Sequence, residues 1–258
     1  MNTRAVTTVL ALAAILTICG GKETQVQPAT SAYAPNTDTT FTDRRDGKVY
    51  RIAKIGRQVW FAENLNYAAE GSVCYGEGGR VEVRYDSIAR RLSNAEVRAN
   101  CAKYGRLYTW EAAMKACPAG YHVPTLAEWD TLEKSVGGDE YKPDGFTTGT
   151  GEKLKSTGGW DDWKGKSGNG TDEYGFSALP GGYGGAGPYR VFYYAGTRGE
   201  WWSATETKGC VDDDPEHCDW GDAKIRIMDC YDGDLSWSIA PKVVFISLRC
   251  VRDKGGEQ

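Results

Sequence analysis

The stretch that decides the fold is 116-ACPAGYHVPTLAEWDTLEKSV-136, in which a cysteine and a two-proline turn precede a helix signal. Each proline fixes the backbone φ angle and removes a backbone donor, so the residues between them form an extended or turning connection. Thr125 followed by Glu128 has the spacing of a capping box. Beyond it, apolar residues recur at helical spacing and define one buried face, which consists of Leu126, Trp129, Leu132 and Val136. We therefore predict a helix over residues 126–136.

A second helix is predicted just upstream, over residues 110–116. Thr109 is a good N-cap, and the apolar residues that follow share one helical face, namely Trp110, Ala113, Met114 and Cys117. A third, short helix is compatible with the run 90-RRLSNAEVRANC-101, capped at Ser93 or Asn94, inside residues 68–100, which otherwise resemble a surface excursion.

Strand signals lie at the two ends of the predicted domain. A turn at Asp46-Gly47 precedes a β-hairpin over residues 48–61 that is interrupted at Gly56. Near the C-terminus, β-rich runs predict a final antiparallel set at 200–204, 223–228 and 243–251. Residues 137–200 are rich in Gly, Asp and Trp and predict long loops. The predicted class is α+β, with two short helices packed on short antiparallel strands and long irregular loops.

Composition excludes some classes of function. Thirty-three glycines, nine tryptophans and fifteen tyrosines in 258 residues favour a loop-rich fold over a helical bundle. The formal net charge is -4 and no basic stripe is apparent, so we expect no nucleic-acid partner.

The N-terminus has the pattern of an export signal. Arg4 precedes an apolar run over residues 5–18 that is too short for a comfortable membrane span. Leu16 stands three residues before Cys19, as in a bacterial lipobox, although Ile18 replaces the usual small residue. We expect residues 1–19 to be a signal peptide ending at lipidated Cys19; an ordinary secreted protein cut nearby is the alternative. In both cases the chain is exported from the cytoplasm to an oxidising compartment, in which disulfides persist.

The rest of the chain divides by composition. Residues 20–42 are poor in large aliphatic side chains and predict a flexible linker. The folded domain is expected over 43–253, followed by a short tail, 254–258. The expected location is the outer membrane or the cell surface, with contact to the membrane through the lipid anchor only.

Several motifs, in one order along the predicted domain, resemble a known family, the Fibrobacter succinogenes major paralogous domain. They are Asp46-Gly47-x-x-Tyr50, Ile55-Gly56-x-Gln58-x-Trp60-x-x-Glu63-Asn64-Leu65, Cys101-x-x-Tyr104-Gly105-Arg106-Leu107-Tyr108-Thr109-Trp110, Cys117-Pro118-x-Gly120-Tyr121-His122-Val123-Pro124-Thr125-x-x-Glu128-Trp129, Gly175-Phe176-Ser177-Ala178-Leu179-Pro180-Gly181-Gly182, Trp201-Trp202-Ser203-Ala204-Thr205 and Arg249-Cys250-Val251. The resemblance implies an exported, often lipidated protein with a C-type lectin-like fold similar to that of formylglycine-generating enzymes. It implies no established biochemical activity.

Eight cysteines leave seven if Cys19 is lipidated. The resemblance implies the pairs Cys74–Cys101 and Cys117–Cys250. Cys210 and Cys218 flank an acidic insert and are expected to close it, although seven cysteines permit other connectivities. Cys230 is left over and is expected to be an inert, part-buried thiol.

Two groups of acidic residues are calcium candidates, because calcium takes six to eight oxygen ligands. The acidic insert supplies the first group, Asp212, Asp213, Asp214 and Glu216, with His217 and Asp219 beside it. A solvated acidic loop is the alternative for this group. The second group, Asp229, Asp232 and Asp234, is explained equally well by a hairpin turn. His122, between the two prolines, is expected to hydrogen-bond to backbone in a structural role. We expect no other cofactor.

Aromatic residues in polar, glycine-rich contexts are the remaining lead. Exposed Trp and Tyr rings stack on sugars and anchor interfaces, and the candidates for such a ligand-binding role are Trp160, Trp163, Trp220, Tyr231 and Trp237. The alternative is that these rings fill small cores under the loops. Trp60, Trp110, Trp129, Trp201 and Trp202 are expected to be in the core.

These signals predict a surface-tethered binding or adhesion module that is not an enzyme and whose partner is a polysaccharide or a cell-surface protein. One alternative is an oxidoreductase similar to formylglycine-generating enzymes. That chemistry uses two cysteines to bind copper, and the C-terminal region offers Cys230 alone. The other alternative is a purely structural surface protein.

Overall fold

The computed structural model describes residues 39–83, 86–137, 149–207 and 221–254. These residues contain three β-sheets and four helices, which are joined by loops. All of them belong to one unit, Asn36–Gln258. The predicted α+β class is confirmed, with more helices than the two expected. None of the helices described is long and apolar enough to cross a membrane.

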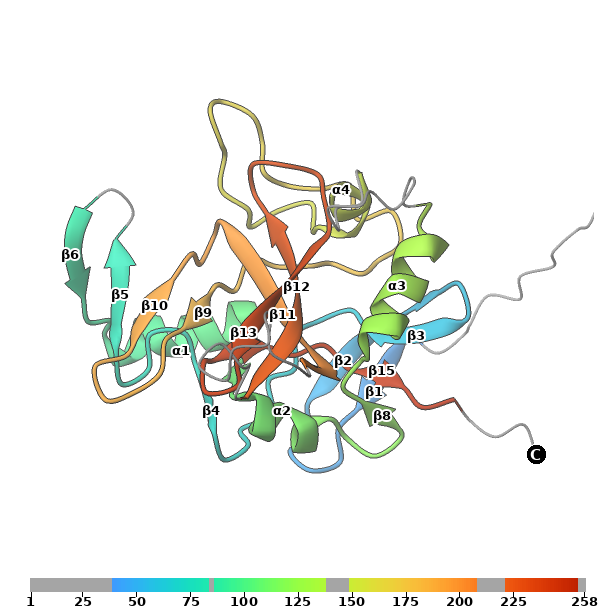
Figure 1. Ribbon diagram of the computed structural model, residues 1–258, viewed down its shortest axis with the longest axis horizontal. Coiled ribbons are helices and arrows are strands. Elements are labelled where there is room, and N and C mark those ends of the chain that lie inside the picture. Colours follow the sequence, from blue (N-terminus) through green and yellow to red (C-terminus); the bar gives the residue numbers. More distant parts are fainter. Residues whose placement is uncertain (1–38, 84–85, 138–148, 208–220, 255–258) are drawn as a thin grey trace, which may run out of the picture. The chain divides into compact units, whose positions relative to one another are not determined.

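The first sheet has five strands and contains the predicted N-terminal hairpin (Figure 1). Its order is β1 (Thr40–Thr42), β2 (Val49–Ile55), β3 (Gln58–Phe61), β15 (Val251–Arg252) and β8 (Tyr121–His122). Gly56 makes the tight turn between β2 and β3 at φ 58°, in the left-handed region that suits a two-residue hairpin loop.

The expected domain start at Asp43 is wrong, because the preceding residues are already part of this sheet. β1 pairs with β2 in antiparallel register, with Phe41 opposite Tyr50. The ring of Phe41 lies 5.6 Å from that of Phe61 and 4.8 Å from that of Tyr121. One large aromatic in an otherwise polar linker sequence is enough to anchor this strand.

The second sheet has six strands in the order β13 (Ser236–Pro241), β12 (Asp222–Asp229), β11 (Arg198–Glu206), β14 (Ile246–Ser247), β7 (Leu107–Tyr108) and β4 (Ser72–Val73). The strands predicted at 200–204 and 223–228 are confirmed in β11 and β12. The antiparallel strand predicted over 243–251 is wrong: β14 runs parallel to β11, and the chain then crosses to the first sheet as β15.

Arg249 lies in the segment that crosses from β14 in the second sheet to β15 in the first, and its side chain is fully buried. Its guanidinium donates to the carbonyl oxygens of Phe61, Phe176 and Ser177 and, at 3.0 Å, to Asn64 Oδ1. Three backbone oxygens and the Asn64 side chain thereby bind the buried cation, while its Nε has no hydrogen-bond partner among the described residues. Burial lowers the pKa of Arg249 to about 9.

The third sheet occupies much of the predicted surface excursion. Its order is β6 (Asp86–Arg90), β5 (Arg80–Val83), β10 (Val191–Tyr193) and β9 (Tyr183–Gly184). β5 and β10 are parallel, and Figure 1 shows the β5–β6 hairpin beside β10. The ring of Phe192, on β10, packs against the ring of Tyr75, with the two ring centroids 5.3 Å apart.

The two predicted helices are confirmed as α2 (Trp110–Ala116) and α3 (Leu126–Ser135). The short helix signalled at 93–101 is α1 (Asn94–Tyr104), the longest of the four, with Ser93 and Glu96 forming a capping box. α4 (Thr150–Leu154) lies in a region predicted as loop.

The capping box of α3 forms as predicted, because Thr125 and Glu128 bond each other's backbone amides. Three of its four predicted core residues are buried, and the ring of Trp129 lies 4.8 Å from that of Trp60. The predicted face of α2 is partly wrong: Ala113 is buried as predicted, but Met114 is exposed, and Ala112 and Ala116 are buried as well.

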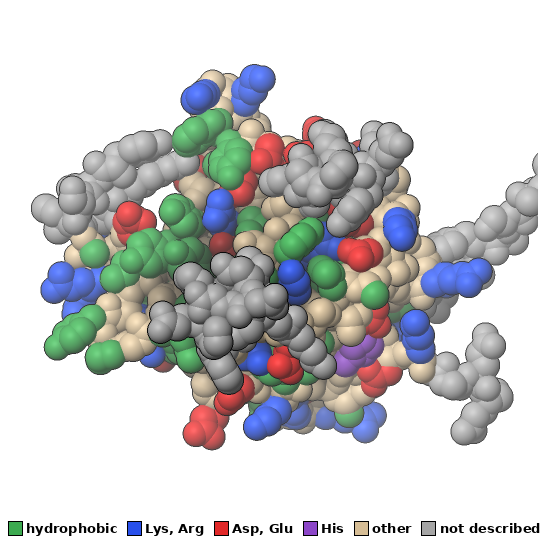
Figure 2. All heavy atoms as spheres, viewed as in Figure 1, with side chains coloured by type: hydrophobic (Ala, Val, Ile, Leu, Met, Phe, Trp, Pro, Cys, Tyr) green, Lys and Arg blue, Asp and Glu red, His purple; other side chains and the backbone are tan. Residues whose placement is uncertain are grey.

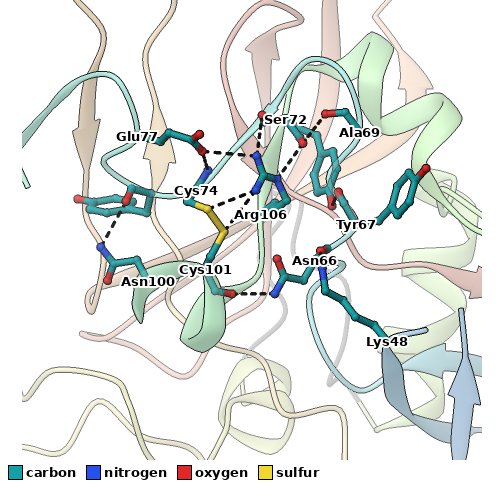
Figure 3. Close-up of a disulfide and its surroundings, with 12 residues drawn as sticks. Lys48, Asn66, Tyr67, Ala69, Ser72, Cys74, Glu77, Asn100, Cys101 and Arg106 are labelled. Carbon is teal, nitrogen blue, oxygen red and sulfur yellow. Dashed lines mark hydrogen bonds and ion pairs between the residues drawn. A yellow bond between two sulfur atoms is a disulfide. The ribbon is translucent and has the colours of Figure 1, made fainter. Parts of the chain in front are cut away.

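Both disulfides implied by the family resemblance are present. Cys117–Cys250 joins the end of α2 to the segment before β15, and Cys74–Cys101 joins α1 to the loop after β4. In the second, the Arg106 guanidinium donates to both sulfur atoms (Figure 3). Cys210 and Cys218 lie outside the described residues.

Candidate functional site

A cleft of about 700 Å³ lies among the described residues. One wall consists of three loops, at 161–163, 194–198 and 229–231. The rest of the lining comes from Asn100 of α1, from the β5–β6 hairpin at Val81, Glu82 and Arg90, and from Tyr75 and Leu92 on either side of that hairpin. The cleft therefore joins distant parts of the chain, since Tyr75 and Tyr231, 156 residues apart in sequence, both line it.

Arg198 and Asp229 occupy the centre of the loop wall. They lie directly opposite each other in the register of β11 and β12, at the end where both strands meet the cleft. Arg198 Nε donates to Asp229 Oδ1 at 2.7 Å, and Nη2 donates to Oδ2 at 3.2 Å. The Tyr231 hydroxyl also donates to Asp229 Oδ2, at 2.8 Å. The carboxylate is thus held by two donors from two directions.

A second carboxylate lies behind this pair. Glu200 Oε1 is 3.7 Å from Arg198 Nη1, and Glu200 is only 5% exposed. Burial raises the pKa of Glu200 to about 7, even though Arg198 favours its charged form. For Arg198, burial disfavours the charge, but the hydrogen bond and the negative charge of Asp229 outweigh it and the pKa is raised.

Three aromatic side chains lie around the pair. Tyr231 is 52% exposed, and its ring centroid lies 6.0 Å from that of Trp163. Tyr194 is 47% exposed, and the Arg198 guanidinium lies 5.2 Å from its ring centroid. Ring faces beside hydrogen-bonding groups are the usual composition of a ligand cleft.

The three loops are fixed to one another by backbone hydrogen bonds. The amide of Asp161 donates to the carbonyl of Gly196 at 2.7 Å, and the amide of Cys230 donates to the carbonyl of Thr197 at 2.8 Å. Gly196 has φ 89°, and a Cβ added there would lie 2.9 Å from Asp161 Oδ1. Only glycine suits this position, so the loop wall is preformed.

Lys155 supports the same wall from inside the domain. Its side chain is buried, and Nζ donates to the carbonyl oxygens of Asp229 at 3.0 Å and Asp232 at 2.7 Å. Nζ also lies 5.1 Å from the ring centroid of Trp160. Burial lowers the pKa of Lys155. This lysine holds the 229–232 backbone in place and has no access to a ligand.

The structure places the aromatic residues predicted to bind a ligand in different environments. The structure brings Trp163 and Tyr231 together in the cleft. Trp160 is only 4% exposed and its Nε1 donates to the Ala178 carbonyl at 2.9 Å, so a ligand-binding role for this ring is wrong. Trp237 is 38% exposed on β13, outside the cleft, with Lys224 Nζ 3.9 Å from its ring centroid. Trp220 lies outside the described residues.

The metal candidates that fall within the described residues do not form a site. The acidic insert, with Asp212, Asp213, Asp214 and Glu216, lies outside the described residues. Among the described residues no group of three or more His, Cys, Asp or Glu side chains has metal-binding geometry. In the second candidate group, Asp229 binds Arg198 and Tyr231 instead.

His122 has a structural role, but its predicted backbone partners are wrong. Nδ1 lies 2.6 Å from Asp253 Oδ1, and Nε2 lies 2.9 Å from Glu128 Oε1. The side chain thereby links the α3 capping box to the end of β15. Burial opposes protonation of the imidazole, yet the two carboxylates outweigh it and raise the pKa of His122.

Cys230 lies outside both disulfides, as expected, and at 4% exposure it is buried more fully than the part-buried thiol that the sequence predicts. Sequence reasoning missed Arg198, Tyr194 and Asn100 as lining residues of the cleft. Arg198 lies just before the predicted strand at 200–204 and resembles any cation that flanks a strand.

The fold and the cleft define a disulfide-linked α+β domain with a preformed polar and aromatic surface site. The chain belongs to the Fibrobacter succinogenes major domain family, whose model matches residues 53–252. No curated protein and no solved structure matches the chain.

Proposed function

We propose that this protein is a surface-tethered binding module that recognises a carbohydrate in the cleft through Trp163 and Tyr231. The observation that carries the proposal is the placement of these two rings beside the Arg198–Asp229 pair in one preformed cleft. Aromatic faces cover the apolar C–H faces of sugar rings, while charged hydrogen-bonding groups bind hydroxyls.

The arrangement favours binding over catalysis. Asp229 already accepts hydrogen bonds from Arg198 and Tyr231, so its oxygens are held in place by the protein and are less accessible to a reacting group. Cys230 lines the cleft but its side chain is buried, which does not favour the two-thiolate copper chemistry of formylglycine-generating enzymes. We infer that the cleft positions a ligand and does not transform it.

The location of the module follows from the N-terminal sequence. We propose that residues 1–19 direct export, that Cys19 carries the lipid anchor, and that the segment after it tethers the domain at the outer membrane or cell surface. We also propose that the domain is a variant of the C-type lectin-like fold, a family of folds that commonly bind ligands through irregular loops.

A glycan array tests the proposal with three forms of the full chain: wild type, Trp163→Ala and Trp237→Ala. The proposal predicts that wild type and Trp237→Ala retain the same polysaccharide, and that Trp163→Ala loses at least about tenfold in affinity for it. Equal retention by all three forms would contradict a site in the cleft. Retention of a cell-surface protein but of no glycan would favour an adhesion partner.

A further inference from the structure

A second cavity adjoins the cleft. It measures about 500 Å³ and lies between the glycine-rich loop at 76–79 and α1. Leu92 lines both hollows. Of the two arginines that precede it, Arg90 lines the cleft and Arg91 lines the second cavity. The two hollows are therefore neighbours on either side of Leu92, close enough for adjacent units of one ligand chain to occupy both.

The second cavity carries a net positive charge in a chain whose formal net charge is -4. It is lined by Arg91, Arg98 and Arg106 and by a single acidic residue, Glu77. Glu77 Oε2 lies 3.4 Å from Arg106 Nη2 and accepts from the Cys74 amide at 2.7 Å. Glu77 thus balances Arg106 and leaves two positive charges.

Arg106 forms the floor and is fully engaged by the protein. Its Nε donates to the Ser72 hydroxyl at 2.9 Å and its Nη2 donates to the Ser72 carbonyl at 3.1 Å. Figure 3 shows this guanidinium between Ser72, Glu77 and the sulfur atoms of Cys74–Cys101. Arg91 and Arg98 differ, because neither guanidinium has an ion-pair or hydrogen-bond partner within the described part of the chain.

The position of Arg98 is set by α1. Asn94, Val97 and Arg98 line the cavity at i, i+3 and i+4, so they share one face of the helix. Cys101 follows at i+7 on that face, and its disulfide to Cys74 ties the face to the opposite wall. The capping box at Ser93 fixes the start of the helix. The walls that carry the charges are thus covalently and locally held.

We propose that Arg91 and Arg98 bind the carboxylate or sulfate group of an acidic polysaccharide whose neighbouring sugar ring lies in the cleft. Guanidinium groups match the planar oxygens of such anions with paired hydrogen bonds. This inference rests on the proposed function of the cleft and specifies its ligand as an acidic glycan.

The test measures binding of the full chain to polygalacturonate and to its carboxyl-reduced, neutral form. Wild type is expected to bind the acidic form at least about tenfold more tightly, with the difference shrinking as salt is added. The double variant Arg91→Ala/Arg98→Ala is expected to lose the preference and to keep the affinity for the neutral form. The control Arg44→Ala/Arg57→Ala removes two other exposed arginines and is expected to behave as wild type.

The outcomes separate the two claims. If wild type binds both forms equally, or if the double variant keeps the preference, the arginine site is overturned while the cleft stands. If Trp163→Ala abolishes binding of both forms and the double variant abolishes only the preference, both are supported. If wild type binds neither form nor dextran sulfate, both fail. Binding to anionic phospholipid vesicles in place of these glycans would also overturn the arginine site as an acidic-glycan site.

Discussion

Arg198 and Asp229, 31 residues apart in sequence, are joined by two hydrogen bonds of 2.7 and 3.2 Å. Arg198 begins β11 and Asp229 ends β12, and both residues line the cleft. The pair does two things at once. It closes the end of the strand ladder, and it presents a fixed cation and anion between Tyr194 and Tyr231. A site built on paired strands moves less than one built on loops alone, so its geometry is ready before a ligand arrives.

The first prediction concerns the energetic value of this pair. Asp229→Asn is expected to lower the free energy of unfolding by about 2 kcal/mol, because it leaves the largely buried Arg198 guanidinium without its charged acceptor. Urea unfolding measures the change. The control is Glu63→Gln, which breaks the exposed Arg51–Glu63 pair and is expected to cost under about 1 kcal/mol. Equal losses in the two variants would contradict a structural role for the Arg198–Asp229 pair.

The second prediction concerns Glu200 and pH. The pKa of Glu200 is about 7 in the folded protein, against 4.5 for an exposed glutamate, so the folded state holds the proton more tightly. The stability that protonated Glu200 contributes is therefore fully present below about pH 4.5 and is lost as pH rises through about 7. The loss amounts to at most about 3 kcal/mol of the free energy of unfolding. Glu200→Gln removes this loss. Its melting temperature is expected to exceed that of wild type by more at pH about 8 than at pH about 5; a difference independent of pH would contradict the assignment.

The third prediction concerns His122 between Asp253 and Glu128. Its pKa is raised above 6.5, so its stabilising effect is present below about pH 6.5 and is lost as pH rises through the folded pKa. His122→Gln is expected to lower the melting temperature below that pH and to have little effect well above it. Thermal melts of both proteins across this pH range provide the check, and a constant offset would show that protonation of the imidazole plays no part.

The fourth prediction compares the two disulfides. Cys117–Cys250 closes a loop with a sequence separation of 133, and Cys74–Cys101 closes one of 27. In the chain-entropy model their removal costs about 5 and about 3.5 kcal/mol of stability, respectively. Cys117→Ser/Cys250→Ser is therefore expected to destabilise more than Cys74→Ser/Cys101→Ser in denaturant unfolding. The reverse order would show that local contacts outweigh loop closure.

Much of the scaffold could be predicted because its signals are local. The capping box and helical spacing of α3 lie within a dozen residues, and the β2–β3 hairpin is marked by Gly56. β13 was missed because its Ser-Trp-Ser-Ile sequence puts its apolar residues on the exposed side of the strand.

The cleft was harder to predict because its contacts are distant in sequence. Trp160 and Trp163 have similar polar, glycine-rich neighbours, yet a hydrogen bond to Ala178 fixes the first ring in the core and leaves the second at the cleft. Arg198 faces Asp229 only through the register of two long strands, and no local pattern encodes that register.

The most direct test of the cleft is hydrogen–deuterium exchange of the full chain with and without the polysaccharide it retains. A ligand seated in the cleft is predicted to slow amide exchange at 161–163, 194–198 and 229–231 together, and to leave β13 around Trp237 unchanged. Protection of β13 with no change in the three loops would contradict the cleft as the binding site.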